Sequence, residues 1–294
     1  MGFKTARLKQ LSPGNYIAAV SGGVDSVVLL DLLVNSDEFL SDKFKFIVAH
    51  FDHGIRVDSD DDAKFVAELA KKYDLSFETK CEKLGSGASE ELARNRRYAF
   101  LRALAKEHNA KIITAHHADD VVETVAINLK RGTGWRGLAI LDSDIVRPLI
   151  DISKVEIIDY AKQHNLQWHE DSTNASDTYL RNRIRQRLVT LDDDSKRQIL
   201  ALRVQQVELK HQIDEEVAQL VGTGPDYGRY FFTQGDDLAA LECLRFLTNR
   251  RLTRPQLERA LIAIKTAKPG TIYEAGAGVE FGFTSRNFTI KLIK

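Results

Sequence analysis

The sequence has few cysteines, no surplus of either charge and no long apolar stretch. Its two cysteines, Cys81 and Cys243, lie far apart and form no CxxC motif, so the sequence offers no zinc or iron–sulfur site. The 42 basic residues balance 42 acidic ones, which argues against a uniformly basic nucleic-acid binder. The first ten residues lack the apolar core of a secretory signal, and no stretch approaches a membrane span. We therefore expect a cytoplasmic protein that has no membrane partner.

The composition is that of an ordinary globular protein, with 43% hydrophobic and 29% charged residues, and 294 residues are enough for about two domains. Arginines nevertheless gather in three parts of the chain. These clusters are Arg94, Arg96, Arg97 and Arg102; Arg181, Arg183, Arg185 and Arg187; and Arg245, Arg250, Arg251, Arg254 and Arg259. Each cluster alone is best explained as a solvated helix face, but the three together favour a local surface that follows a phosphate backbone.

The segment from Ser21 to Ser26, SGGVDS, lies between two apolar runs. It follows a predicted strand at Tyr16 to Val20 and precedes a predicted buried helix at Val27 to Leu33. Gly22 and Gly23 can adopt positive φ angles and let a ligand approach the backbone, and the N-terminus of the following helix attracts anions. The turn therefore predicts a phosphate site.

Two other interpretations of this turn carry less weight. Ser26 or Asp25 could simply cap the helix, but two hydroxyls, two glycines and a carboxylate in one short turn favour ligand binding. The segment is also neither a Walker A motif nor a Rossmann glycine motif. The carboxylate of Asp25 could hold Mg²⁺ against bound phosphates. The expected phosphate-binding residues are Ser21, Gly22, Gly23, Val24, Asp25 and Ser26.

Strands and helices alternate through the first part of the chain. Further strands are predicted at 44–49, 76–80 and 111–115, with helices beginning near residue 59, spanning 89–108 and ending near residue 131. This alternation predicts an α/β fold with a parallel sheet covered by helices on both faces. Ligands of such sheets bind beyond the carboxyl ends of the strands. We therefore expect three loops to meet there: Ser21 to Ser26, His50 to Arg56 and His116 to Asp120.

The third loop carries the residues best suited to catalysis. If the helix after the strand is in phase from His116, then His116, Asp120 and Glu123 fall on one face at positions i, i+4 and i+7. The order of these residues does not match the HExxH zinc motif. A helix N-terminus complemented by acidic residues, with His116 as its cap, is the structural alternative. Because Glu123 lies beyond the first turn, Mg²⁺ coordination or acid–base chemistry is favoured.

The remaining segments suggest how the chain is divided. The glycine-rich segment 131–138 is predicted to be a loop, either a linker or a lid, and Ser153 with Glu156 forms a capping box. A polar loop at 169–174 precedes an arginine-rich helix, and a long helix at about 195–220 looks like a connector. A basic helix near 255–266 and strands at 278–283 and 287–293 predict a small α+β domain. We predict a catalytic domain over residues 1–191, a helical connector over 192–221 and an accessory domain over 222–294.

Several motifs, taken in order, resemble the tRNA(Ile)-lysidine synthetases of the N-type ATP pyrophosphatase (PP-loop) superfamily. The motifs are SGGVDS, HFDHGIR, ELARNRRY, TAHHADDVVET, RGTGWRGL, RPL, and EDSTN followed by RNRIR. SGGVDS is shared across the superfamily, whereas the ordered set is specific. The motifs cover about residues 16–187, and the C-terminal region resembles the family more weakly. The resemblance implies an adenine nucleotide alpha hydrolase-like fold.

The resemblance also implies a ligase that consumes ATP with Mg²⁺ and joins L-lysine to the wobble cytidine of a tRNA(Ile) with a CAU anticodon. An adenylated cytidine would be the intermediate, and the products would be lysidine, AMP and pyrophosphate. The resemblance implies that the reaction centre is lined by His116, Asp120 and Glu123. It also implies that the substrate or a phosphate is faced by Arg97 and Arg185. Asp25 would bind the metal, and the C-terminal domain would contact the tRNA. Candidates for the lysine pocket are Asp52, Glu170 and Asp171.

Three other functions share parts of this pattern. A sulfur-inserting tRNA enzyme normally uses paired cysteines, which Cys81 and Cys243 do not supply. An amide-forming synthetase would share SGGVDS but would cleave ATP without tRNA. A non-catalytic nucleotide- or RNA-binding module would not require the grouping of His116, Asp120 and Glu123. The oligomeric state is left open, a homodimer included.

Overall fold

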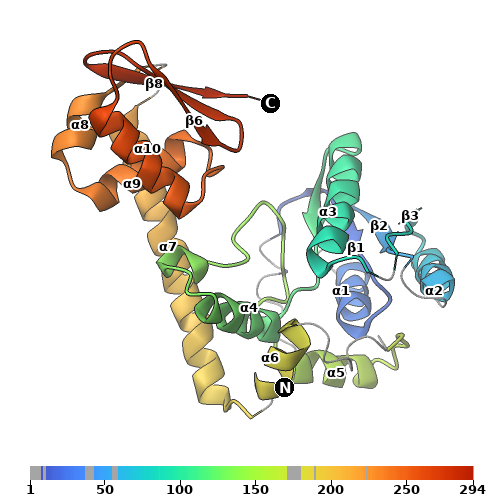
Figure 1. Cartoon of the computed structure of the whole chain (residues 1–294). Coiled ribbons are helices and arrows are strands. Elements are labelled where there is room, and N and C mark those ends of the chain that lie inside the picture. Colours follow the sequence, from blue (N-terminus) through green and yellow to red (C-terminus); the bar gives the residue numbers. More distant parts are fainter. Residues whose placement is uncertain are drawn as a thin grey trace. The chain divides into compact units, whose positions relative to one another are not determined.

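The computed structural model describes residues 8, 11–36, 43–54, 59–85, 87–170, 180–188, 190–222, 224 and 226–293. The chain divides into two compact units, Met1–Val207 and Glu208–Lys294 (Figure 1). The long helix α7 (Asp193–Val221) runs from the first unit into the second and matches the helix predicted at about 195–220. No helix among the described residues is long and apolar enough to cross a membrane.

The first unit contains a four-stranded parallel sheet in the order β3-β2-β1-β4. Its strands are β1 (Gly14–Ala19), β2 (Phe44–Asp52), β3 (Ser76–Cys81) and β4 (Ala110–Ile113). Its helices before α7 are α1 (Val24–Val34), α2 (Ser59–Lys72), α3 (Glu90–Glu107), α4 (Ala118–Lys130), α5 (Lys154–Gln163) and α6 (Leu180–Leu188). The predicted alternation of strands and helices is confirmed, although β2 continues through His50 and Asp52, where the sequence predicts a loop.

The strand order creates a switch point beside β1. The chain moves from β1 to β2 and β3 on one side, and then returns to place β4 on the other side of β1. Ligands of open α/β sheets bind at such points, beyond the carboxyl ends of the two strands that flank them. The segments that leave β1 and β4 there are Ser21–Ser26 and residues 114–117.

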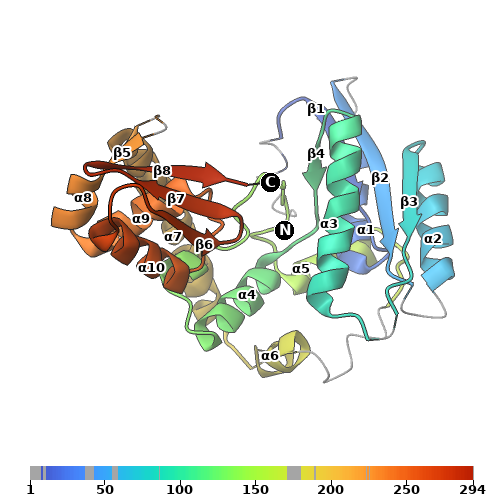
Figure 2. The ribbon, with the colours of Figure 1, turned by 45° about the horizontal axis from the view of Figure 1, so that its top comes forward.

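Helices cover both faces of this sheet, as the sequence predicted. Alternate residues of β1 point to opposite faces, as in any strand. Tyr16 and Ala18 pack in a core with α1, α2 and α5, whereas Ile17 packs in a separate core with α3. Figure 2 shows α3 on one side of the strands and α1 on the other.

A buried carboxylate fixes α1 relative to α5. Asp31 of α1 is 4% exposed, and its two carboxylate oxygens accept hydrogen bonds from the hydroxyls of Tyr73 (2.7 Å) and Tyr160 (2.9 Å). Tyr160 belongs to α5, and Ser153 and Glu156 form the predicted capping box at the start of that helix. The N-terminus of α5 is therefore held at a defined position relative to α1.

The second unit is a small α+β domain, as predicted. Its antiparallel sheet has the strand order β5-β8-β7-β6 and packs with helices around a core that includes Phe281 and Phe288, both fully buried. The strands are β5 (Asp226–Gly228), β6 (Ile272–Gly276), β7 (Val279–Phe283) and β8 (Asn287–Leu292). The helices are α8 (Arg229–Gln234), α9 (Asp237–Leu247) and α10 (Arg254–Thr266). The sequence indicated α10, β7 and β8 but not the other four elements.

Candidate active site

The loop Ser21–Ser26 joins β1 to α1 and is braced by its own hydroxyl groups. The Ser26 hydroxyl donates to the carbonyl oxygen of Gly23 (2.9 Å) and accepts from the backbone N–H of Ser21 (3.1 Å). Gly22 has a φ angle of +91°, which favours glycine. Gly23 is the N-cap of α1 and no described side chain caps that helix, so the capping role considered for Ser26 or Asp25 is not observed. An uncapped helix N-terminus suits an anion.

Asp25 in the first turn of α1 lies between two cations. Its Oδ1 accepts a hydrogen bond from Lys154 Nζ at 2.5 Å, and its Oδ2 lies 3.7 Å from His117 Nε2. Burial raises the pKa of this carboxyl, but the interactions with His117 and Lys154 outweigh it and lower the pKa to about 2. Asp25 is therefore ionised at neutral pH.

His117 is the N-cap of α4 and lies among three carboxylates. Its side chain is 7% exposed, and Nε2 lies 3.5 Å from Asp120 Oδ2 as well as near Asp25. Among the described residues Nδ1 has no hydrogen-bond partner, and it lies 3.8 Å from Asp119 Oδ2. Burial lowers the pKa of His117, but Asp25 and Asp120 outweigh it, so the pKa is raised. The imidazole thus favours the cationic form and links the phosphate loop to α4.

His116 does not share a helix face with Asp120 and Glu123, so that prediction was wrong. β4 ends at Ile113 and α4 begins at Ala118, which leaves His116 in the connection between them. Its Nδ1 makes a 2.8 Å hydrogen bond with Thr114 Oγ1. Burial lowers the pKa of His116 to about 3; Asp120 acts in the opposite sense, and nearby arginines add to the decrease. His116 is therefore neutral at physiological pH.

Buried Glu123 and the partly exposed Arg185 form a two-point ion pair. Glu123 is 3% exposed, and its oxygens accept hydrogen bonds from Nε (2.5 Å) and a terminal nitrogen (3.1 Å) of Arg185 on α6. The bonds to Glu123 raise the pKa of Arg185 despite partial burial, and Asp120 and Asp25 contribute in the same direction. The structure thus brings four predicted site residues together: Asp25, Asp120, Glu123 and Arg185.

Two lysines complete this group, and the sequence analysis did not identify them. Lys154 is the first residue of α5, and its backbone N–H donates to Asp119 Oδ2 at 2.7 Å while its side chain binds Asp25. Lys196 Nζ lies 3.4 Å from the other Asp119 oxygen. The capping box at Ser153 marks the start of α5 but not its neighbours, so the sequence holds no direct signal for these contacts. The N-termini of α1, α4 and α5 are linked through these side chains.

Arg97 lies on α3, close to His116. Its guanidinium carbon is 5.4 Å from the centre of the Tyr98 ring, and Arg94 and Arg97 both contribute to the lowered pKa of His116. The site therefore has a cationic side formed by α3. The glycine-rich segment 131–138, predicted to be a loop, contains the short 3-10 turn η2 (Trp135–Gly137).

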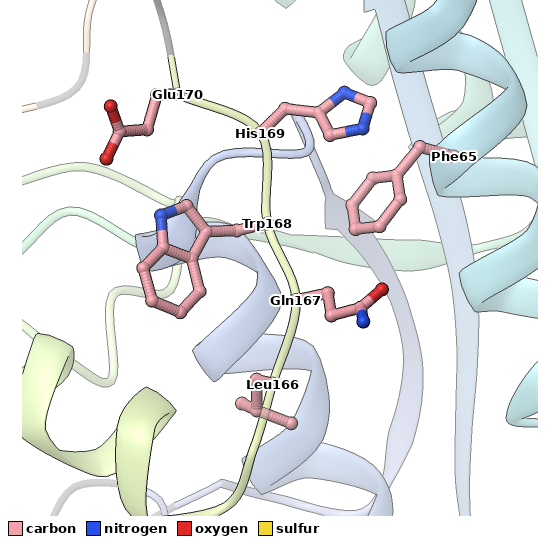
Figure 3. Close-up of a pocket in the computed structure, with 6 residues that line it drawn as sticks. All are labelled: Phe65, Leu166, Gln167, Trp168, His169 and Glu170. Carbon is pink, nitrogen blue, oxygen red and sulfur yellow. The ribbon is translucent and has the colours of Figure 1, made fainter.

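The candidates for the lysine pocket lie at different places. Asp52 is 6% exposed, and its Oδ1 accepts the backbone N–H of Gly54 at 2.7 Å. Glu170 lines a shallow depression of about 440 Å³, which Figure 3 shows. Its other lining residues are Phe65, Leu166, Gln167, Trp168 and His169. Asp171 lies outside the described residues, as do most of the EDSTN motif and residues 55 and 56 of the HFDHGIR motif.

The depression adjoins the phosphate loop. The backbone N–H of His169 donates to the carbonyl oxygen of Gly22 at 3.0 Å. The His169 ring stacks on Phe65 with a centroid distance of 4.4 Å, and its Nδ1 lies 2.7 Å from Asp62 Oδ1. These contacts hold the glycine turn against α2.

The site fits Mg²⁺ bound together with a phosphate. Among the described residues, no group of three or more His, Cys, Asp or Glu side chains could hold a metal ion alone. Mg²⁺ at phosphate sites normally uses one or two carboxylates and completes its coordination with substrate phosphates and water. Asp25 supplies an ionised carboxylate in the first turn after the phosphate loop. It is the residue best placed for this role.

Comparison with known proteins agrees with this geometry. The PP-loop domain family matches residues 4–191. A tRNA(Ile)-lysidine synthase of Thermotoga sp. (strain RQ2) is 32% identical, and the match covers 95% of this chain and 72% of that protein. The chain belongs to the tRNA(Ile)-lysidine synthase family. The resemblance and the adenine nucleotide alpha hydrolase-like fold inferred from the motifs are thereby confirmed.

Some relatives match a smaller share of this chain. A tRNA(Ile)-lysidine synthase of Exiguobacterium sibiricum is 39% identical over 60% of this chain and 42% of its own length. The matched region thus spans less than half of that relative. A U34-tRNA thiolase of Methanococcus maripaludis, solved with its [4Fe-4S] cluster, shares the fold with a TM-score of 0.58 and 18% identity, over 70% of this chain and 77% of that one. Here the two cysteines lie in different units, Cys81 exposed and Cys243 buried.

Proposed function

We propose that the protein is a tRNA(Ile)-lysidine synthetase, which joins L-lysine to the wobble cytidine of a tRNA(Ile) with a CAU anticodon. In the first step the carbonyl oxygen of the cytosine attacks the α-phosphate of ATP, and pyrophosphate leaves. In the second step the ε-amine of lysine forms a bond to the adenylated carbon, the carbon–oxygen bond breaks, AMP leaves, and the amine loses a proton. Because its substrate is a tRNA, we assign the activity to the cytoplasm.

One observation carries this proposal: Asp25 of the phosphate loop lies beside the carboxylates and cations of α4, α5 and α6 at the switch point of the sheet. Binding of a nucleotide alone does not require these opposed charges. A reaction that releases pyrophosphate and then uses an amine requires both, because the phosphates need cations and the amine needs an anionic environment.

Each part of the site has a role in this reaction. The loop Ser21–Ser26 would hold the departing pyrophosphate with its backbone N–H groups and the N-terminus of α1. Mg²⁺ bound at Asp25 would neutralise charge on the phosphates. Lys154 and His117 are paired with Asp25, so they lie where they can shift to the phosphates when ATP binds.

The α4 carboxylates suit the second step. Asp119 and Asp120 present oxygens 3.8 and 3.5 Å from the two nitrogens of the His117 ring, and an ammonium group is attracted to such acceptors. His116 remains neutral, so it can exchange hydrogen bonds with the cytosine but would be a weak base. Arg185, held by Glu123, would face the phosphate or the base from α6.

The second unit would bind the tRNA. Arg259 on α10 and Arg286, next to β8, are exposed there, and a basic surface of this kind binds a phosphate backbone without reading sequence. The active-site unit would then read the wobble base, which must leave its stack to reach ATP.

The test measures AMP and pyrophosphate release from ATP by the purified protein with L-lysine and an unmodified tRNA(Ile) bearing CAU. We expect release, and transfer of labelled lysine to the tRNA, only when both substrates are present. ATP cleavage without tRNA would instead indicate a PP-loop enzyme of the amide-forming kind. In the same assay, Asp25→Ala should lower turnover by at least about 100-fold, because the phosphates lose the carboxylate that holds their counter-ion. Near-normal turnover of this variant would refute the assignment of the loop.

A further inference from the structure

Three arginines of α3 surround one buried tyrosine ring. The guanidinium carbons of Arg94, Arg97 and Arg102 lie 5.0, 5.4 and 5.9 Å from the centre of the Tyr98 ring, which is 6% exposed overall. A cation at this distance from an aromatic face is attracted to it. The ring therefore restrains the directions of all three side chains.

The three arginines differ in their distance from the reaction centre. Because α3 leads from the end of β3 to the start of the parallel strand β4, its first turns lie at the carboxyl edge of the sheet. Arg94 and Arg97 belong to these turns. Arg102 follows Arg94 by two helical turns, which places it about 12 Å further along the helix axis. Arg94 and Arg97 are thus on the side of the phosphate loop, and Arg102 is not.

The direction of the His116 pKa shift agrees with this placement of Arg94 and Arg97 on α3. Burial is the main cause of its low pKa, and Arg147, Arg97 and Arg94 add to it. Arg147 is 8% exposed and donates to the carbonyl oxygens of Leu141 and Ile145, so it is held in place by backbone groups. Positive charge therefore accumulates beside His116.

Arg94 lies on the side of the reaction centre and has no carboxylate partner among the described residues. The carboxylates of the site already have cationic partners: Asp25 has Lys154, Glu123 has Arg185, and Asp119 has Lys196. Among the residues that the structure describes, no carboxylate lies within ion-pair distance of Arg94, whose recorded contact is with the Tyr98 ring. A half-buried guanidinium of this kind is stabilised when it binds an anion.

We propose that Arg94, with Arg97 beside it, binds the α-carboxylate of the L-lysine substrate. This inference rests on the proposed function, in which the ε-amine reacts and the α-carboxylate takes no part in the chemistry. With its carboxylate at α3, the lysine side chain would extend past His116, and its ammonium group would point toward the α4 carboxylate Asp120. The site would then recognise both ends of the amino acid by opposite charges.

A phosphate of the tRNA backbone is another oxyanion that arginine binds, but the structure favours the carboxylate. Arg94 is half-buried and restrained on Tyr98, which suits a small anion that enters the site. Arg102 and Arg96 on the same helix are exposed, and exposed side chains are the ones that follow a solvated phosphate backbone.

The experiment compares L-lysine with 1,5-diaminopentane, which has the same amine but no carboxylate. Each amine is titrated with saturating ATP and tRNA for the wild-type protein, Arg94→Gln, Arg94→Lys and Arg102→Gln. Loss of a hydrogen-bonded charge pair should raise the KM for lysine about 10- to 100-fold in Arg94→Gln and leave the KM for diaminopentane within about 2-fold. Arg94→Lys should recover part of the preference for lysine. The Arg102→Gln control loses a contact with the same Tyr98 ring, and it should keep the wild-type ratio of the KM for lysine to the KM for diaminopentane.

Two results would overturn the subsite. One is an equal rise in the KM for both amines in Arg94→Gln. The other is a rise in the KM for tRNA while the KM for lysine is unchanged, which would assign Arg94 to a backbone phosphate. Wild-type protein that releases no AMP with either amine would overturn the proposed function itself. Wild-type protein that is active but uses both amines equally well would refute the carboxylate subsite alone. Matching thermal unfolding midpoints for the variants would establish that folding is not the cause.

Discussion

The ion pair between Glu123 and Arg185 should contribute measurably to stability, and Arg185→Gln is the change that tests it. The substitution removes the partner of a carboxylate that is 3% exposed and leaves a charge uncompensated in the interior. It also removes an ion pair that joins α6 to α4. We therefore expect the variant to be destabilised and α6 to open more readily than in the wild type.

The size of the effect follows from the burial of the two partners. Breaking a fully buried pair by removing one member costs roughly 3–5 kcal/mol. The side chain of Arg185 is 40% exposed, so solvent screens part of the interaction, and we expect a loss of about 2 kcal/mol. For a domain of this size, such a loss lowers the unfolding midpoint by about 4–8 °C.

A double-mutant cycle followed by thermal and urea unfolding is the assay. Glu123→Gln/Arg185→Gln should be more stable than Arg185→Gln alone, because the orphaned charge is removed together with its partner. Arg187→Gln, an exposed arginine on the same helix, should change the stability by less than about 0.5 kcal/mol. If Arg185→Gln unfolds at the wild-type midpoint, the pair does not hold α6, and the reasoning fails.

Three further predictions concern the loop, the N-cap of α4 and the second unit. Gly22→Ala should cost about 1–3 kcal/mol and weaken ATP binding, because alanine is strained at a φ angle of +91°; an unchanged urea midpoint would contradict this. His117 has a raised pKa, so its charged form stabilises the fold below its ordinary pKa of 6.5, and the contribution is lost as the pH rises through the raised value. Without Mg²⁺, His117→Gln should therefore lower the free energy of unfolding more at pH 6 than at pH 9. Equal losses at the two pH values would refute the ion pairing of His117 with Asp25 and Asp120. Arg259→Gln/Arg286→Gln should weaken tRNA binding with a smaller salt slope and leave ATP binding unchanged; equal losses of both would argue against the tRNA role.

The parallel sheet was predictable because its signals are local. Apolar runs such as Phe44 to Ala49 specify buried strands, and the capping box of Ser153 and Glu156 marks the start of α5. The glycine turn between β1 and α1 is complete within six residues, so the sequence alone could mark it as a candidate phosphate site. Elements of the second unit such as β5, with three residues, carry too little pattern to be recognised.

The contacts inside the site were less predictable because they join distant parts of the chain. Lys154 and Asp25 are 129 positions apart, and Arg185 and Glu123 are 62 positions apart. The sequence identified Asp25, Glu123 and Arg185 by residue type and motif. It could not show which cation would pair with which carboxylate, because that depends on how α1, α5 and α6 pack.

The two adjacent histidines show how a small error in helix phase changes the chemistry. Extending the helix back to His116 placed the wrong histidine on its inner face. Because β4 ends at Ile113, four residues are needed to leave the sheet before α4 can begin, and the last of them becomes the N-cap. An N-cap residue has extended backbone angles, so its side chain points across the helix start instead of along a helix face. His117 therefore reaches Asp25 of the neighbouring loop as a cation, while His116 remains neutral beside the arginines of α3.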